Sequence, residues 1–401
     1  MNILSISENI LAYISAFGLL QGILLAGVIY FHPRSDRKVN KFLAWYIACL
    51  SIVMSGPLLL KVIAWKDSFF IAGFPTLVGP LLFFYVCSFK KSITLAKAFP
   101  HLVLFLIYVI GAYLFVLHLD KTYPNSQEFP KEGLRSPVGL AFFLFRYIQQ
   151  IYYYFLCRRE LGAYQKGIQQ LYSETSRINL SWVKWLINGY ILLIMISVVI
   201  YFFMAKYPVN FYFLYLLNIA ICTPYIYGAT YKGITQPTIW QLENKNIPQQ
   251  QAATVETIEQ AFDKLQTKQV IQDNRAEEII SKVIAIMEED KLYQEPELTL
   301  QHLSDKLGYP AYQVSLAINE GMKKTFYDLV NSYRVEEAKR LLLDPKSRSY
   351  TILSVGFEAG FNSKTTFNTV FKKFTGHTPT HFRDKQTTEP MHAGINHNYV
   401  L

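Results

Sequence analysis

The sequence predicts an all-α protein, in which a seven-span transmembrane helix bundle is followed by a cytoplasmic domain of two helix-turn-helix units. Two observations predict this fold. Hydrophobic residues make up 51% of the 401 residues and charged residues only 17%, which is apolar for a soluble protein, and the apolar residues gather in long N-terminal runs. In the last third of the chain, apolar residues recur instead with the period of amphipathic helices.

Seven apolar runs fill residues 1–230, and each is close to the roughly 20 residues that a helix needs to cross a bilayer. No basic stretch precedes the first run, so we expect a membrane span there rather than a cleaved signal peptide. The predicted spans are 9–31, 42–60, 69–89, 99–119, 138–157, 182–205 and 209–230.

Lysine and arginine are unevenly divided between the two sets of predicted loops, with twelve in one set and six in the other. Cytoplasmic loops carry the excess in membrane proteins, which predicts a multi-pass protein of the bacterial inner membrane with its N-terminus outside and its C-terminal domain in the cytoplasm. The odd number of spans agrees with this orientation. The richer set is Arg34, Arg37, Lys38, Lys41, Lys90, Lys91, Lys97, Arg158, Arg159, Lys166, Arg177 and Lys184.

The span at 138–157 carries polar residues on one helical face. Arg146 lies near its middle, and Gln149, Gln150 and Tyr153 follow at i+3, i+4 and i+7. A charge at bilayer depth is costly and usually faces the bundle interior. Two interpretations stay open: these four residues form a pocket for an anionic or polar ligand, or they form a structural cluster that holds the bundle together.

Residues 352–383 predict two short helices separated by a glycine turn. Gly360 is placed where a tight turn needs φ > 0, and Asn362 or Ser363 can cap the next helix. This arrangement is typical of a helix-turn-helix, whose second helix enters the major groove of DNA. The buried stripe of that helix is predicted to be Phe367, Val370, Phe371 and Phe374. Its polar face offers Lys364, Thr365, Asn368 and Thr369 to base edges and Lys372 and Lys373 to phosphates.

The pattern GF-N-S-K-T-T-F-x-x-x-FKK-x-x-G-x-TP-x-x-FR resembles the second helix-turn-helix of AraC-type transcription regulators. The stretch at 298–343 resembles the first, with TLQHLSDKLGY, a recognition helix at 310–320, and FYDLVNSYRVEEAKRLL as the helix that links the two units. The resemblance covers about the last third of the chain. It implies a sequence-specific DNA-binding transcription regulator, whose partners are double-stranded DNA and RNA polymerase.

The first unit departs from the family pattern at two positions. The family has a glycine where Lys323 stands, and Gly321 lies two residues earlier, so we expect a shifted turn. The family has a polar residue or arginine where Leu316 stands, so we expect the second recognition helix to dominate base reading. With Val314, Ala317 and Ile318 predicted to be buried, the residues of the first unit left to bind DNA are Tyr312, Ser315, Leu316 and Asn319.

A linker rich in glutamine is predicted at 233–272. Its apolar residues repeat at 3-4-3 spacing over two heptads, which is too short for a coiled coil that is stable alone. A helical stalk that pairs two chains into a homodimer and a helix that packs on the next domain both stay open. The repeating residues are Val255, Ile258, Phe262 and Leu265.

No pattern for catalysis, a cofactor or a metal site occurs in the sequence. The four cysteines all lie inside apolar runs, which is typical of small buried side chains. The histidines are scattered, without an HExxH motif, and there is no P-loop, GxGxxG or nucleophile elbow. We therefore expect a protein that is not an enzyme.

We expect a one-component sensor in which a signal of unknown chemistry at the membrane bundle changes promoter binding. The expected parts are a transmembrane domain at 1–232, the linker at 233–272, the DNA-binding domain at 273–385 and a flexible tail at 386–401. An alternative is a seven-helix transporter, or another membrane protein, whose C-terminal module binds a protein rather than DNA. A membrane enzyme is a third class, which no motif supports.

Overall fold

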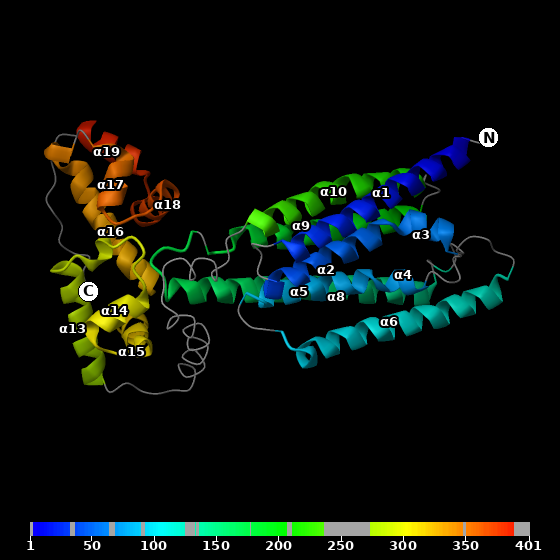
Figure 1. The fold of residues 1–401 in the computed structure, drawn as a ribbon, viewed down its shortest axis with the longest axis horizontal. Helices are drawn as coiled ribbons and strands as arrows, with labels where there is room; N and C mark the ends of the chain where they lie inside the picture. The colour runs from blue at the N-terminus through cyan, green and yellow to red at the C-terminus, as the bar shows by residue number, and fades with distance from the viewer. Residues whose placement is uncertain are drawn as a thin grey trace. The chain divides into compact units, whose positions relative to one another are not determined.

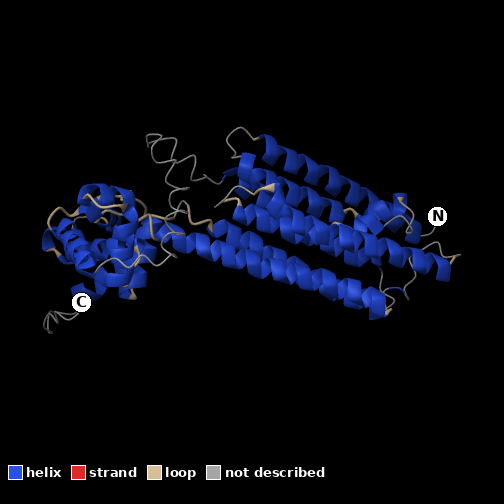
Figure 2. Cartoon of the chain, turned by 90° about the horizontal axis from the view of Figure 1, so that it is seen from below, coloured by secondary structure: helices blue, strands red, loops and turns tan. Residues whose placement is uncertain are grey.

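The computed structural model describes residues 3–32, 37–63, 69–89, 93–124, 133, 136–176, 178–206, 211–235, 273–347 and 350–388. These residues are almost entirely helical, and no strand occurs among them (Figure 1, Figure 2). One antiparallel bridge, between Tyr172 and Thr299, is isolated. The predicted all-α fold class is therefore confirmed. The chain divides into two compact units, an N-terminal unit of Met1–Tyr164 and Leu180–Leu242 and a C-terminal unit of Gln165–Asn179 and Glu243–Leu401.

Helices lie at all seven predicted spans of the N-terminal unit. They are α1 (Ile3–Phe31), α2 (Arg37–Met54), α3 (Gly56–Val62), α4 (Phe69–Gly73), α5 (Pro75–Cys87), α6 (Leu95–Thr122), α8 (Pro137–Gln169), α9 (Ser181–Lys206) and α10 (Phe211–Thr235). Among the described residues, four stretches are long and apolar enough to cross a membrane: Asn9–Phe31, Phe69–Cys87, Ala96–Thr122 and Ser181–Phe203. Val39–Met54 is apolar but shorter. The count of seven spans therefore stays a prediction.

Prolines divide two of the predicted spans into two helices each. The run at 42–60 contains α2 and α3, and the run at 69–89 contains α4 and α5. A proline stands in the first turn of α3 and of α5. The N–H groups in the first turn of a helix have no carbonyl partner within that helix. Proline, which lacks an N–H, therefore loses no hydrogen bond there and is often found where a new helix begins.

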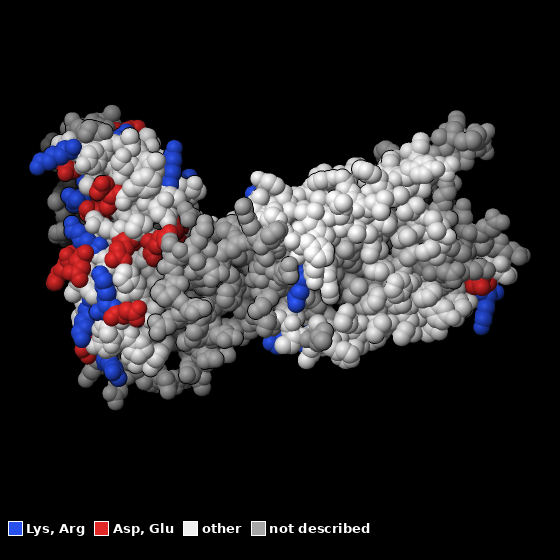
Figure 3. Space-filling model, in the orientation of Figure 1, with Lys and Arg blue, Asp and Glu red and all other residues white. Residues whose placement is uncertain are grey.

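The surface of the N-terminal unit is apolar. Large side chains such as Leu20, Ile110 and Phe202 are 69%, 59% and 56% exposed. On the face drawn in Figure 3, the described part of this unit shows almost no charged side chains, whereas charges of both signs crowd the C-terminal unit. Apolar surface of this extent marks contact with a membrane or a partner.

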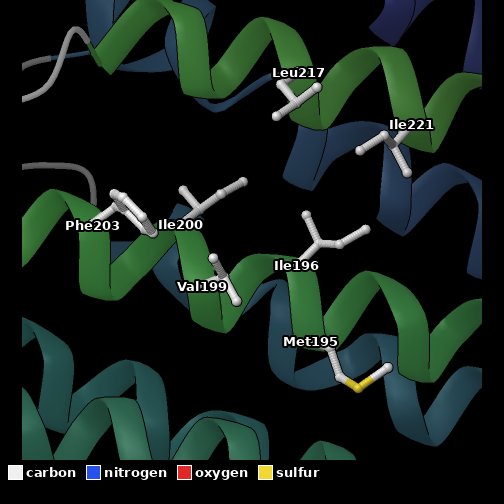
Figure 4. Close-up of a pocket in the computed structure, with 7 residues that line it drawn as sticks. All are labelled: Met195, Ile196, Val199, Ile200, Phe203, Leu217 and Ile221. Atoms are coloured by element: carbon white, nitrogen blue, oxygen red, sulfur yellow. The ribbon is translucent and has the colours of Figure 1, made fainter.

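A groove of about 410 Å³ lies between α9 and α10 (Figure 4). Only apolar side chains line it, so it offers no side-chain hydrogen bond that would orient a polar ligand. The lining residues are Met195, Ile196, Val199, Ile200, Phe203, Leu217 and Ile221.

Four helices of the C-terminal unit begin at hydroxyl caps. Thr299, Thr325, Thr351 and Ser363 each accept a hydrogen bond from the backbone N–H three residues on, which satisfies a donor that the helix leaves free. The structure confirms Thr299 as a cap and selects Ser363 over Asn362. The elements are α13 (Asp273–Glu288), η2 (Leu292–Gln294), α14 (Leu300–Leu307), α15 (Ala311–Leu316), η3 (Ala317–Gly321), α16 (Phe326–Leu343), η4 (Pro345–Ser347), α17 (Ile352–Glu358), α18 (Lys364–Thr375) and α19 (Pro379–Thr388).

Helix α16 links two hydrophobic cores. The core of the first helix-turn-helix unit includes Leu303 and Val314, and α16 contributes Leu329 to it. The core of the second unit includes Phe367 and Phe371, and α16 contributes Ala338. Because one continuous helix takes part in both cores, it fixes the separation of the two helix-turn-helix units.

The turn before α16 is where the family pattern places it. Lys323 has a φ of +54°, the left-handed conformation that favours glycine, whereas Gly321 lies in the preceding π-helical turn without a positive φ. The expectation of a shifted turn is therefore wrong. The lysine adopts the glycine conformation instead, at a cost of roughly 1–2 kcal/mol.

Parts of the predicted organisation lie outside the described residues. The linker from residue 236 onward, with its two heptads, is one of these, and the tail beyond residue 388 is another. The two interpretations of the linker therefore stay open, and the predicted domain boundaries stay predictions.

Candidate nucleic-acid interface

The second helix-turn-helix consists of α17, a turn at Gly360 and α18. Gly360 has a φ of +95°, as predicted, and a Cβ there would lie 2.6 Å from the carbonyl oxygen of Tyr293. The turn therefore needs glycine both for its φ and for its close approach to the first unit. Phe367 and Phe371 are buried as predicted, but Phe374 is 39% exposed. The buried stripe ends one turn early because α18 runs past the edge of the second core.

The polar face of α18 is accessible. Lys364, Thr365, Thr369, Lys372 and Lys373 are exposed, and Asn368 is half-buried. Lys373 Nζ lies 2.7 Å from Oδ1 of Asp328 on α16, so its charge is partly neutralised within the unit. The face thus presents hydroxyl, amide and ammonium groups, which are the groups that bind base edges and phosphates.

The recognition helix of the first unit is short. Helix α15 passes after six residues into the π-helical turn η3, in which Ala317 and Ile318 are buried as predicted. Tyr312 is 37% exposed and Leu316 is half-buried, but Ser315 is only 6% exposed.

The last of the first-unit candidates, Asn319, binds two side chains. Its Nδ2 donates to Oγ of Ser315 at 3.3 Å and to Oε1 of Gln170 at 3.1 Å. Two of the four side chains expected to read DNA in this unit are therefore covered or bound within the molecule.

Gln170 belongs to a stretch far from α15 in the sequence. The 165–179 segment, which comprises the end of α8 and the connection to α9, is part of the C-terminal unit. The N–H of Ser173 donates to the carbonyl oxygen of Leu298 at 3.2 Å, and the N–H of Leu300 donates to that of Leu171 at 2.9 Å. These bonds flank the bridge between Tyr172 and Thr299. Sequence reasoning missed this contact, because the stretch looks like an ordinary cytoplasmic loop.

The same segment also reaches α16 and α18. Ser173 is fully buried, and its carbonyl oxygen accepts from Nδ2 of Asn331 on α16 at 3.1 Å. The hydroxyl of Thr366, near the start of α18, donates to Oε1 of Glu174 at 3.1 Å. The 165–179 segment therefore contacts both helix-turn-helix units and the helix between them.

Arg334 on α16 is fully buried at this junction. Its Nε donates to the carbonyl oxygen of Tyr293 at 2.7 Å, and its Nη2 donates to that of Glu295 at 2.6 Å and to Oγ of Ser173 at 3.2 Å. Burial lowers the pKa of Arg334 to about 10, and the charge of Glu174 acts against this shift. The guanidinium stays protonated at neutral pH, and its hydrogen bonds fasten α16 to the loop before α14.

In the N-terminal unit, the polar face of α8 is turned largely toward other helices. Gln149 and Gln150 are buried, and their Nε2 atoms donate to the carbonyl oxygens of Thr76 and Pro75 on α5, each at 3.1 Å. Tyr153 is buried as well, and its hydroxyl shares a hydrogen bond with Nδ1 of His101. These contacts favour the structural interpretation for three of the four residues.

The bond from Gln149 has a local cause. Pro80 lies four residues after Thr76 inside α5, and its ring lacks the N–H that would bind the Thr76 carbonyl. Gln149 supplies the missing donor. Arg146 is placed differently, since it is half-buried and its Nη2 donates to the hydroxyl of Tyr147 at 2.6 Å. Of the four residues, Arg146 therefore remains the candidate for a ligand.

Comparison with known proteins concerns the C-terminal region. Residues 303–385 match a family model described as a helix-turn-helix domain. Uncharacterized HTH-type transcriptional regulators of Staphylococcus aureus strains MSSA476 and COL are each 29% identical over 119 residues, which cover 29% of this chain and 16% of those proteins. A probable transcription factor of Proteus vulgaris, PqrA, is 25% identical over 118 residues, which are 93% of its length. No solved structure matches the chain.

The C-terminal region is an AraC-type helix-turn-helix domain. The match ends within α19, at residue 385, and includes both recognition helices, in the order expected from the resemblance. The chain spans only about a sixth of the length of the staphylococcal relatives, so the similarity to those proteins concerns this domain.

We expect Gln149→Leu to destabilise the N-terminal unit by about 1 kcal/mol, because the Thr76 carbonyl would lose its donor. In a Pro80→Ala background the alanine restores a backbone N–H, so the same substitution should cost clearly less. A double-mutant cycle on the thermal unfolding of the full chain in detergent measures this difference. An equal cost in both backgrounds would contradict the assigned role of Gln149.

Proposed function

We propose that the chain is a membrane-embedded transcription regulator that binds DNA sequence-specifically and couples a signal at the membrane bundle to promoter binding. The exposed polar face of α18, held on a capped and buried helix-turn-helix, is the observation that carries this proposal. The Proteus vulgaris relative supports it, because the matching segment makes up 93% of that probable transcription factor. The proposal includes no enzymatic step.

In this proposal α18 enters the major groove of double-stranded DNA. Lys364, Thr365, Asn368 and Thr369 face base edges, and Lys372 and Lys373 lie near phosphates. The first unit contributes less, through Tyr312 and Leu316, because Ser315 is buried and Asn319 is hydrogen-bonded to Gln170. A homodimer formed through the linker and a contact with RNA polymerase complete the proposal. The homodimer is taken from the heptad spacing of the linker, and the contact with RNA polymerase from the family resemblance.

The membrane part of the proposal is supported by the surface of the N-terminal unit. Apolar side chains as large as Leu20 and Phe202 would face water at a cost, and they are stable against lipid. The loop charges give the orientation, with the N-terminus outside and the DNA-binding domain in the cytoplasm of a bacterium.

The alternative, a transporter with a protein-binding module, is not favoured by the C-terminal unit. A helix that docks in a protein groove presents an apolar face to its partner. The apolar residues Phe367, Val370 and Phe371 of α18 are instead buried in its own core, and the side left free is polar.

The predicted topology can be tested with fusions. A reporter that is active only in the cytoplasm should be active when fused after Lys232, because that site follows the last predicted span on the inner side. Activity from a fusion after Lys121, and none after Lys232, would reverse the orientation.

The proposed DNA contacts predict different effects for two substitutions on α18. Asn368→Ala should lose roughly 1–3 kcal/mol on the true site and relax preference at one base position, because it removes a contact with a base edge. Lys372→Ala should weaken binding to all sequences and make binding less sensitive to salt, because it removes a phosphate contact. Gel shifts of the full chain in detergent, on fragments from the gene's own neighbourhood, measure both effects.

Lys346→Ala is the matched control for Lys372→Ala, since Lys346 is also exposed but lies on η4, outside the recognition helix. Equal losses for the two lysines would show that α18 does not face the DNA. Failure of the full chain to bind any of the fragments would count against DNA binding itself and favour the protein-binding alternative.

The signal is proposed to act near Arg146, through an anionic or polar ligand that the guanidinium would attract. Arg146→Gln should abolish the change in promoter output that the signal causes, while the melting temperature and the DNA affinity of the protein stay as in the wild type. Promoter output and thermal unfolding of the same variant are the measurements. A large fall in melting temperature would assign Arg146 to the structural cluster with Gln149 and Gln150.

A further inference from the structure

The two recognition helices are both held by the 165–179 segment. Gln170 binds the amide of Asn319 at 3.1 Å in the first unit, and Glu174 binds the hydroxyl of Thr366 at 3.1 Å in the second. Asn319 is a residue that helical spacing assigns to the DNA-facing side. Thr366 is itself buried, but it lies in the first turn of α18 beside Lys364 and Thr365, which head the exposed polar face. The segment therefore contacts both recognition elements next to the residues that would face DNA.

The described part of the segment has its own anchor. The side chain of Gln165 donates to the carbonyl oxygen of Asn179 at 2.6 Å and so closes the loop at its base. Leu171 packs against the core of the first unit, and the fully buried Ser173 bonds the backbone of Leu298 from both its N–H and its hydroxyl. This geometry is that of a specific docking site.

One group of the segment, the carboxylate of Glu174, opposes DNA by its charge, although the segment also contains Lys166 and Arg177 and carries a net charge of +1. Glu174 places a carboxylate near the N-terminus of α18, where the helix dipole and free N–H groups favour an anion. A phosphate of DNA approaching the same end of α18 would meet this negative charge. The carboxylate and the nucleic acid are thus alternatives for one electropositive position.

Two buried acceptor atoms weaken the contact between the segment and the rest of the C-terminal unit. Oε2 of Glu174 and Oδ1 of Asn331 are buried with no hydrogen-bond partner among the described residues. A buried acceptor without a donor costs about 1–3 kcal/mol, and that cost disappears when the segment leaves and water reaches these atoms. The contact is specific, but these atoms lower the free energy needed to separate it.

We propose that the 165–179 segment is an autoinhibitory element, which occupies the surface between the two recognition helices and must leave it before DNA binds fully. This inference rests on the proposed DNA binding. It identifies the segment as the part of the chain through which the membrane bundle would control DNA binding. The segment is continuous with α8, the helix that carries Arg146 in the N-terminal unit.

The bridge between Tyr172 and Thr299 allows a direct test. The two hydrogen bonds on either side of it identify a non-hydrogen-bonded antiparallel pair, whose Cα atoms lie about 4.5 Å apart, within reach of a disulfide. The variant Tyr172→Cys/Thr299→Cys should therefore crosslink within the full chain when membranes are treated with copper phenanthroline. The oxidised form should bind a duplex from the gene's own upstream region at least tenfold more weakly than the same sample after reduction with dithiothreitol.

The reduced sample controls for any effect of the two substitutions on folding. The single variants Tyr172→Cys and Thr299→Cys control for the native cysteines, of which Cys49, Cys157 and Cys222 are buried. In a second comparison, Glu174→Gln should raise DNA affinity by several-fold more than Glu297→Gln. Both changes remove one negative charge, but Glu297 is an exposed residue outside the segment.

Three results would overturn the proposal. The first is a double variant that crosslinks no faster than the single variants. The second is an oxidised form that binds DNA as well as, or better than, the reduced form, which would make the segment a support for binding. The third is an absence of DNA binding in the reduced form and in Glu174→Gln despite efficient crosslinking, which would overturn the proposed function as well.

Discussion

The buried guanidinium of Arg334 is the interaction on which the C-terminal unit depends. A charge in a protein interior is tolerated only when hydrogen bonds replace its water. Arg334 donates such bonds to the backbone carbonyl oxygens of Tyr293 and Glu295 and to the hydroxyl of Ser173. The loop that provides the first two carbonyl groups is the one that Gly360 approaches, so close that a Cβ would not fit. One cation on the linking helix thereby fixes the backbone of the first unit against the turn of the second.

Features whose cause is local could be predicted from the sequence. The caps at Thr299 and Ser363, the left-handed turn at Gly360 and the burial of Phe367 and Phe371 follow from chemistry within a few residues, and the structure has all of them. Lys323 shows the limit of such reasoning, because the sequence offered Gly321 for the turn while the fold demanded a positive φ two residues later. Tertiary packing there overrides the preference of the residue.

Features that depend on distant pairing leave no local pattern. Ser315 has the spacing of a DNA-facing residue and is buried, and its neighbour Asn319 binds Gln170, which comes from 149 residues earlier in the chain. The polar face of α8 shows the same limit in the N-terminal unit. Gln149 looks like part of a ligand pocket until Pro80 is seen to leave the Thr76 carbonyl without a helical donor. In both cases the decisive partner lies on another element.

Helix α8 gives a physical reason why the segment after it is suited to carry a signal. An α-helix rises about 1.5 Å per residue, so the stretch from Gln149 to the end of α8 at Gln169 is about 30 Å long. A helix of this length is stiff, because each turn is hydrogen-bonded to the next. A displacement of α8 near Arg146 would therefore reach Gln170 with little loss. Because Gln170 and Glu174 hold one recognition helix each, a shift of this single segment would act on both at once.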